Sequence, residues 1–426
     1  MIQTGLIQNV HDDLLTDISY DFYGLHFASC SLDQKIKVWS LDESTGTWSV
    51  EDEWKAHDAA ISKVSWAHPE FGTILASASF DRTVKIWEQM MSTAVTELQP
   101  NTSSAPQQAS GGSSSRWSER AVLVDARGTV RAVEFAPHHF GLKLARATIS
   151  TDNHLRIYEC LEQSSLATWQ LSEEVDVTSL PIASRPSSHS VAFGTPTHTS
   201  ATLDGASASL VAQALQQSQA PPQGRGGLGN READGGWCIS WCKERYWGEV
   251  IAAGSGISGT IKIIQISPSR RPTTLLTLDP SPAGKLLAEG NAAGVLGESD
   301  APTPYAVTTV AWAPSCGRSY HLIATGSRDG HVRIWKVKPA EDSDMEDDSM
   351  GSKWTASIAA DFDNHRSAVG RVEWNITGTV LSSAGNDGRV RLWKATIGGV
   401  WRPAGSIGVE QTEDEDANME ESAVAD

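Results

Sequence analysis

One pattern recurs five times in this chain: an aspartate in a turn stands six residues before an aromatic residue that closes a short apolar strand. The copies read "SLDQKIKVWS", "SFDRTVKIWE", "STDNHLRIYE", "SRDGHVRIWK" and "GNDGRVRLWK". Internal repetition of this kind is the signature of an architecture in which each unit buries its apolar surface against its neighbours. The pattern therefore predicts one array of like units. The turn aspartates are Asp33, Asp81, Asp152, Asp329 and Asp387.

Two further segments precede each aspartate. The first is a short strand ending in an aromatic residue, as in "DISY", "KVSW", "AVEF", "TVAW" and "RVEW", and the second is rich in small residues, as in "LASAS". A sixth copy, "CISW", "VIAAGS" and "TIKIIQI", keeps the strands but has lost the aspartate from its turn, "GISG". All of these segments are short, β-branched or aromatic, and bounded by turn residues, and no long helical periodicity appears. The chain is predicted to be all-β with six units.

The units are separated by stretches of low complexity that lack a strand pattern and are expected to be loops. We expect a single domain over 1–407 and an acidic, disordered tail over 408–426. The expected units span about 11–56, 57–115, 116–175, 237–277, 304–356 and 362–407, with insertions at about 91–115, 176–236, 278–303 and 339–352. Each unit supplies three strands and a variable outer strand, of which 47–54 and 399–407 are examples.

Composition excludes several classes of function. The formal net charge is −18, and two acidic runs, at 341–348 and 410–426, carry most of it. A general nucleic-acid binder needs a basic surface, so the sequence does not predict nucleic-acid binding. The five cysteines form no disulfide framework, and Cys238 and Cys242 lack two further ligands nearby, so no metal site is predicted and a reducing compartment is expected. No Gly-rich phosphate loop, membrane span or secretory signal is recognised, and no cofactor is expected.

These repeats resemble the WD repeat, which implies a β-propeller whose blades are four-stranded sheets. In that family the Asp of the turn accepts hydrogen bonds from backbone amides and from a His before the first strand. His57 and His365 occupy that position, His11 is suitably placed, and the third and fifth units lack the His, so their turns are expected to rely on the Asp alone. Ser77, His57 and Asp81 could be mistaken for a catalytic triad, but a set copied around a ring indicates a structural role, and no enzyme is predicted.

The two ends of the chain leave two interpretations open. A strand-like segment at 5–10 either closes the sixth blade in the usual way or belongs to an open ring that a partner strand completes by β-augmentation. If the ring is open, the expected partner interface is Leu6, Ile7 and Val10 at the N-terminal edge and Leu392, Trp393, Val400 and Trp401 on the sixth unit. Trp393 has the alternative of filling the core of its own blade.

A more specific resemblance lies in residues 66–88, 135–159, 313–335 and 362–395, including "GRSYH" and "WNITGTVL". These stretches resemble the small WD-repeat nucleoporins of the Y-shaped outer-ring complex of the nuclear pore and their paralogues in the endoplasmic-reticulum vesicle coat, and they favour the nucleoporins. The resemblance implies an open six-bladed propeller that an α-solenoid nucleoporin completes in trans, with other Y-complex nucleoporins as partners. It also implies a second place in the SEA/GATOR complex, at the vacuolar or lysosomal membrane, in TOR signalling. The alternatives are a vesicle-coat subunit and a peptide-reading WD receptor with a closed ring.

Overall fold

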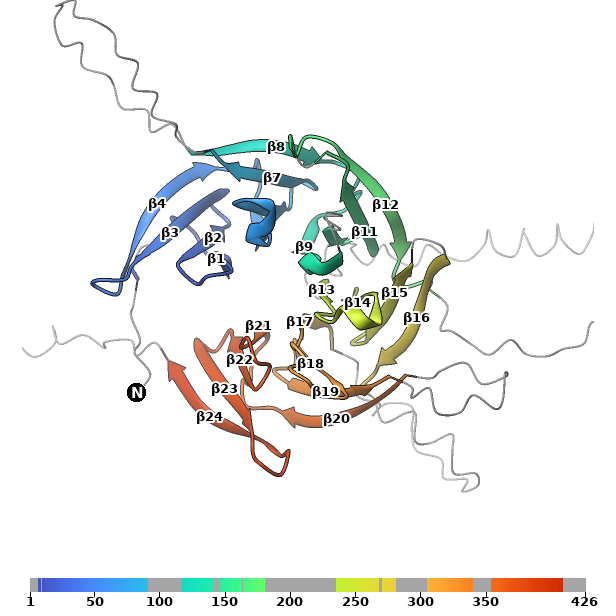
Figure 1. The fold of residues 1–426 in the computed structure, drawn as a ribbon. Coiled ribbons are helices and arrows are strands. Elements are labelled where there is room, and N and C mark those ends of the chain that lie inside the picture. The colour runs from blue at the N-terminus through green and yellow to red at the C-terminus, as the bar shows by residue number, and fades with distance from the viewer. Residues whose placement is uncertain are drawn as a thin grey trace, which may run out of the picture.

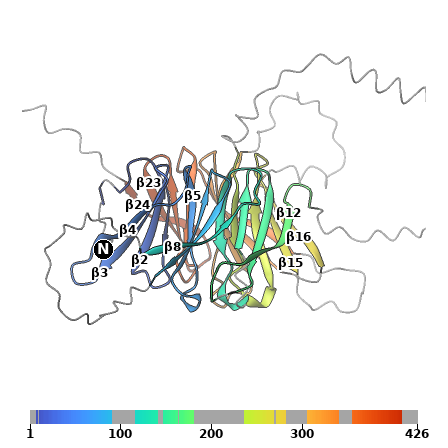
Figure 2. The same ribbon diagram turned by 90° about the horizontal axis from the view of Figure 1, so that it is seen from above.

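The computed structural model describes residues 7–8, 10–90, 116–140, 146–162, 164–180, 235–267, 270–280, 305–339 and 354–408. These residues form six antiparallel sheets of four strands each, which stand as blades around a common centre (Figure 1). Seen from the side, the blades form a single disc (Figure 2). The all-β, six-bladed propeller predicted from the repeats is confirmed. Leu6, most of each predicted insertion and all but the first residue of the predicted tail lie outside the described residues.

Every blade runs outward in chain order, from an inner strand near the centre to an outer strand at the rim. Blade one is β1 (Leu15–Tyr20), β2 (His26–Ser31), β3 (Lys35–Asp42) and β4 (Thr47–Lys55); blade two is β5 (Ile61–Trp66), β6 (Ile74–Ser79), β7 (Val84–Gln89) and β8 (Trp117–Leu123); blade three is β9 (Val130–Phe135), β10 (Arg146–Ser150), β11 (His154–Cys160) and β12 (Trp169–Asp176). Blade four is β13 (Cys238–Trp241), β14 (Glu249–Gly254), β15 (Ile261–Ser267) and β16 (Arg270–Leu278); blade five is β17 (Val307–Trp312), β18 (His321–Ser327), β19 (Val332–Lys338) and β20 (Thr355–Phe362); blade six is β21 (Val369–Trp374), β22 (Val380–Gly385), β23 (Arg389–Ala395) and β24 (Trp401–Gly408). Three short 3-10 helices follow inner strands: η1 (Pro69–Phe71), η2 (His138–Phe140) and η3 (Arg245–Trp247).

The alternation of side chains along a strand explains how the blades stack. On β7, Val84 and Ile86 point toward blade three and pack with Val130 and Val133, whereas Trp87 points the other way and packs on blade one. Successive side chains of a strand point to opposite faces of the sheet, so one apolar strand serves two interfaces. The second strand of blade two, β6 or "ILASAS", is buried along its whole length, whereas β22 of blade six alternates between buried and half-buried residues over its first four positions. The small residues of β6 let neighbouring sheets approach closely.

Two predicted boundaries differ from the structure. β8 pairs with β7, so Trp117–Leu123 completes blade two, although the predicted third unit began at 116. β20 pairs with β19 up to Phe362, so the outer strand of blade five runs past the predicted limit of 356. In both cases a long insertion separates the outer strand from the strand it pairs with, so the sequence alone does not show where the unit ends. The weak fourth unit forms a complete sheet without an Asp in its turn.

Three blades share one buried hydrogen-bond chain at the turn between the second and third strands. In blade two, the indole Nε1 of Trp87 donates to Ser77 Oγ at 2.9 Å, Ser77 lies 2.7 Å from His57 Nε2, and His57 Nδ1 lies 2.8 Å from Asp81 Oδ2. The chain assigns the imidazole proton to Nδ1, because Nε2 accepts from the serine hydroxyl. The other Asp81 oxygen accepts from the backbone N–H of Thr83 at 2.9 Å. The corresponding sets in blades one and six are His11, Ser29, Asp33 and Trp39, and His365, Ser383, Asp387 and Trp393.

The expectation that blades three and five rely on the Asp alone is wrong. In blade three the guanidinium of Arg156 takes the place of the imidazole, donating to Ser150 Oγ at 2.9 Å and to Asp152 Oδ2 at 2.7 Å. Arg333 plays the same part in blade five, at 3.1 Å from Ser327 Oγ and 3.4 Å from Asp329 Oδ2. Both arginines stand four residues after the Asp and enter the site from the third strand. The sequence carries this signal as an arginine at that position in a unit that lacks the His, since the His-containing blades one and two have a lysine there.

Acid should weaken the turn of blade two. Burial alone would raise the pKa of the Asp81 carboxyl, but hydrogen bonds from His57 and Thr83 outweigh it and hold that pKa well below its usual value. The ionised Asp81 therefore contributes stability that is fully present above about pH 4 and is lost as the pH falls below the pKa of about 3.9 that an unfolded aspartate has. We expect D81N to lower the free energy of unfolding by about 1–3 kcal/mol at pH 7 and to make its decline toward pH 2 shallower. Urea titrations across this pH range measure both effects, and D58N, an exposed neighbour, is the control.

Removing the arginine of blade three should be more damaging than removing that of blade five. Arg156 is 1% exposed and also pairs with Glu174 at 2.8 Å, so R156M leaves two carboxylates without their cation. Breaking a buried ion pair from one side costs about 3–5 kcal/mol. Arg333 also pairs with a second carboxylate, Asp361 at 3.0 Å, but its side chain is 12% exposed and its contact with Asp329 is longer, so R333M should cost less. Equal shifts in the urea midpoint for the two variants would contradict this ranking.

Candidate functional site

Blade six has a face that no other blade covers. The residues three and five positions after the turn Asp point toward the following blade. In blades one to five these two side chains are 0–3% exposed, where blade four, which lacks the Asp, is represented by the equivalent residues. They are Ile36, Val38, Val84, Ile86, Leu155, Ile157, Ile261, Ile263, Val332 and Ile334. At the same positions of blade six, Val390 is 37% exposed and Leu392 is half-buried. Ile407 of β24 pairs with Val390 and extends this apolar strip to the outer strand.

Blade one has the complementary uncovered face. The aromatic residue that ends each inner strand packs against the preceding blade: Phe135, Trp241 and Trp312 are 7%, 0% and 2% exposed. The Nε1 of Trp66 donates to a backbone carbonyl of blade one at 2.8 Å. The equivalent residue of blade one, Tyr20, is 55% exposed because no blade precedes it. Its ring touches Trp48, and Val50 on the same face is 46% exposed. We call the space between these two faces the gap; Figure 1 shows the outer strands of blades one and six apart on either side of it.

No sheet among the described residues contains strands from both ends of the chain, so the ring is open. The expectation of a strand at 5–10 is not met where the structure describes it, since residues 7, 8 and 10 belong to no strand. Ile7 and Val10 are half-buried, and Leu6 lies outside the described residues. The alternative in which this segment closes blade six is therefore wrong for the described part of the chain.

The two faces are joined at the inner end. Arg371 on β21 of blade six forms an ion pair with Asp17 on β1 of blade one, and Asp17 also accepts from the backbone N–H of Val64 at 3.1 Å. Asp17 is 7% exposed, so this ion pair is largely shielded from solvent. The inner strands are thus linked across the opening, while the outer strands are not.

The predicted interface residues of blade six fall into two groups. Leu392 faces the gap, and Val400 is 55% exposed in the turn before β24. Trp393 and Trp401 face the opposite way: Trp393 is 0% exposed and stacks on Phe362 of blade five with ring centroids 4.0 Å apart. These two tryptophans belong to the interface between blades five and six, because alternate residues of a strand point to opposite faces. Sequence reasoning missed Tyr20, Val390 and Ile407, which the repeat position of each would have identified.

The described residues were also compared with the requirements of a metal site, a membrane span, a reactive cysteine and a catalytic triad. In the part of the chain that it describes, no group of three His, Cys, Asp or Glu residues could hold a metal ion, and no helix is long and apolar enough to cross a membrane. All five cysteines are free, and burial raises the pKa of the Cys30, Cys238 and Cys242 thiols to about 12, so these three resist ionisation. The Ser77, His57 and Asp81 set has a serine of 0% exposure, out of reach of a substrate.

Comparison with known proteins agrees with this geometry. Residues 5–40, 48–88, 299–336 and 357–394 match the family "WD domain, G-beta repeat", so the molecule is a WD-repeat propeller with an open ring. Over 416 residues the chain is 33% identical to "Nucleoporin SEH1" of Saccharomyces cerevisiae, covering 91% of this chain and 94% of that protein. It is 31% identical to "Nucleoporin seh1" of Schizosaccharomyces pombe over 96% of this chain and 98% of that protein, and 32% identical to "Nucleoporin SEH1" of Homo sapiens over 93% and 86%. The chain belongs to the SEH1 nucleoporin family.

The open faces predict that equivalent substitutions have unequal effects. A buried charge without a partner is strongly destabilising, so V84D between blades two and three should cost about 3 kcal/mol or more. V390D places the same charge at the equivalent position of blade six, where water already reaches the side chain, and should cost less than about 1 kcal/mol. Urea unfolding of the isolated chain measures both values. Equal destabilisation would mean that the blade-six face is covered.

Proposed function

We propose that this chain is a structural scaffold subunit of the outer ring of the nuclear pore complex, and that it binds an α-solenoid nucleoporin by accepting that protein's strands into the gap. The observation that carries the proposal is the pair of uncovered faces. Val390 and Tyr20 occupy repeat positions that are buried by a neighbouring blade elsewhere in the ring, and here they are 37% and 55% exposed. A blade supplied in trans would bury both.

The physical basis of the binding is the same blade packing that holds the ring together. Removing apolar surface from water contributes about 25 cal/mol per Å2, and aromatic residues such as Tyr20 and Trp48 are typical anchors at the centre of an interface. A strand of the partner running beside β24 would also gain main-chain hydrogen bonds, since β24 has no pairing partner on its outer side among the described residues. Because the ring is already folded, the partner alone bears the ordering cost of the new blade.

The open ring and the names of the relatives also bear on the two alternative functions, a peptide-reading WD receptor and a vesicle-coat subunit. A peptide-reading WD receptor predicts a fully closed ring, which differs from the open ring described here. A vesicle-coat subunit would share the open ring, but the relatives reported above carry nucleoporin names. Two finer roles rest on family resemblance. The first is to support the transport of mRNA and protein through the nuclear envelope, together with other Y-complex nucleoporins. The second is a place in the amino-acid-responsive SEA/GATOR complex, which regulates TOR signalling at the vacuolar or lysosomal membrane.

The proposal predicts that charges in the gap abolish assembly without unfolding the chain. Co-expression with an α-solenoid nucleoporin that keeps its N-terminal strands should give a complex that co-elutes on size exclusion. V390D and Y20D should each lower the affinity at least about tenfold, because a charge would be buried without a partner. V122D is the matched control, since Val122 is 40% exposed on the outer strand of blade two, away from the gap.

Three outcomes would contradict the proposal: unchanged co-elution of V390D and Y20D, an equal loss with V122D, or full binding by a solenoid that lacks its N-terminal strands. Selective capture of a coat solenoid in place of a nucleoporin solenoid would assign the chain to the vesicle-coat alternative. Hydrogen exchange of β23 and β1 in the complex gives a second readout. Both strands should gain protection if the partner blade covers them.

A further inference from the structure

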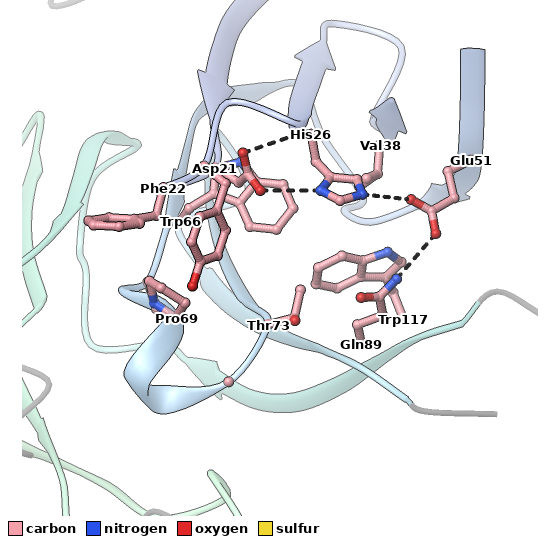
Figure 3. A pocket seen from close by; sticks show the side chains of 13 residues that line it. Asp21, Phe22, His26, Val38, Glu51, Trp66, Pro69, Thr73, Gln89 and Trp117 are labelled. Carbon is pink, nitrogen blue, oxygen red and sulfur yellow. Dashed lines mark hydrogen bonds and ion pairs between the residues drawn. The ribbon is translucent and has the colours of Figure 1, made fainter. Parts of the chain in front are cut away.

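A pocket of about 200 Å3 lies between blades one and two, on the other side of blade one from the gap (Figure 3). Blade one contributes the loop after β1 and part of β4, and blade two contributes η1 with the strand ends beside it. Sites for drug-sized molecules measure about 300–1,000 Å3, so this pocket suits a single side chain. Its thirteen described lining residues include Asp21, Glu51 and His26 but no lysine or arginine.

The walls of the pocket are aromatic. Tyr23, Trp66 and Trp117 line it, as Figure 3 shows for the two indoles. Phe22 and Tyr23 are 65% and 67% exposed at its mouth and contact each other edge to face with centroids 5.3 Å apart. Large apolar rings left in solvent at the rim of a concave site are typical of contact surfaces for another protein.

One carboxylate oxygen in the pocket lacks a hydrogen bond. Glu51 Oε1 accepts from Arg116 Nη1 at 3.1 Å and from Gln89 Nε2 at 3.4 Å. Glu51 Oε2 is shielded from solvent, and among the described residues it has no hydrogen-bond donor; His26 Nε2 is 3.7 Å away, beyond hydrogen-bonding distance. Asp21, by contrast, is occupied by the turn, where it accepts from the backbone N–H groups of Leu25 and His26. A buried acceptor without a donor is costly, and a ligand that donates to it would recover that cost.

We propose that this pocket binds a lysine side chain of a partner protein. Because Glu51 Oε2 is shielded from solvent, the carboxylate would turn toward the pocket as the lysine enters. The ammonium group would then donate to it and lie beside the rings of Tyr23, Trp66 and Trp117, since aromatic rings attract a cation. A single free oxygen suits a compact ammonium, whereas a guanidinium favours a carboxylate with both oxygens free for two parallel hydrogen bonds. The lining of the pocket supports a cationic side chain, because it includes the carboxylates of Asp21 and Glu51 and no lysine or arginine. This inference does not depend on the proposed function, since it concerns a different interface of blade one.

Calorimetric titration of the full chain with two capped heptapeptides, identical except for a central lysine or norleucine, tests the proposal. Norleucine keeps the alkyl chain and lacks the ammonium group. The lysine peptide should bind at least about tenfold more tightly than the norleucine peptide. E51Q should remove that difference. E43Q is the matched control, because it removes one charge from the same blade at an exposed position in the β3–β4 turn.

A second variant keeps the test decisive if E51Q is unstable. Thr73 lines the pocket and is exposed, so T73F should fill the space while leaving Glu51 in place, and it should also abolish lysine-peptide binding. Four results would overturn the proposal. These are equal affinity for the lysine and norleucine peptides, equal losses with E51Q and E43Q, unchanged binding by T73F, or no binding of the lysine peptide at millimolar concentration.

Discussion

The packing of sheet against sheet is the constraint on which the rest of this structure depends. A blade such as β5–β8 carries apolar side chains on both faces, with Ile86 on one and Trp87 on the other, so it needs a neighbour on each side. Six blades in an open ring satisfy this need at five interfaces and leave it unmet on two faces. The proposed scaffold function rests on that shortage, because a sheet supplied by a partner would bury both faces.

The turn network shows how a buried polar site is kept without loss of stability. Each hydroxyl, ring nitrogen and carboxylate in the His57 chain has a partner, as buried polar groups require. Two chemical solutions occupy the same place: an imidazole in blades one, two and six, and a guanidinium in blades three and five. In blade six Arg391 also reaches the site and donates to Asp387. The guanidinium of Arg156 needs an additional anion, Glu174 of the outer strand, which ties three strands of that blade together. The same site can therefore be filled by side chains from different positions in the blade, where hydrogen-bond count and charge both balance.

Much of this fold could be read from the sequence, because the repeat places each residue type at a fixed position in the blade. The sixth copy without an Asp and the outer strand around Pro403 both lie where the repeat predicts, the latter on an edge that tolerates proline. Features that depend on pairing across long insertions were lost, as β8 shows. The sequence left Trp393 open between the partner interface and the core, since its direction depends on which face of the blade has a neighbour. The Glu51 pocket combines residues from two blades, and no local pattern announces it.

The ion pair between Arg371 and Asp17 has a geometric consequence. It links the inner strands of blades six and one near the centre of the ring, while the two blades share no sheet among the described residues. The spacing of the two uncovered faces therefore depends on one charged contact, and a substitution of either residue would act on that spacing as well as on the stability of the inner strands.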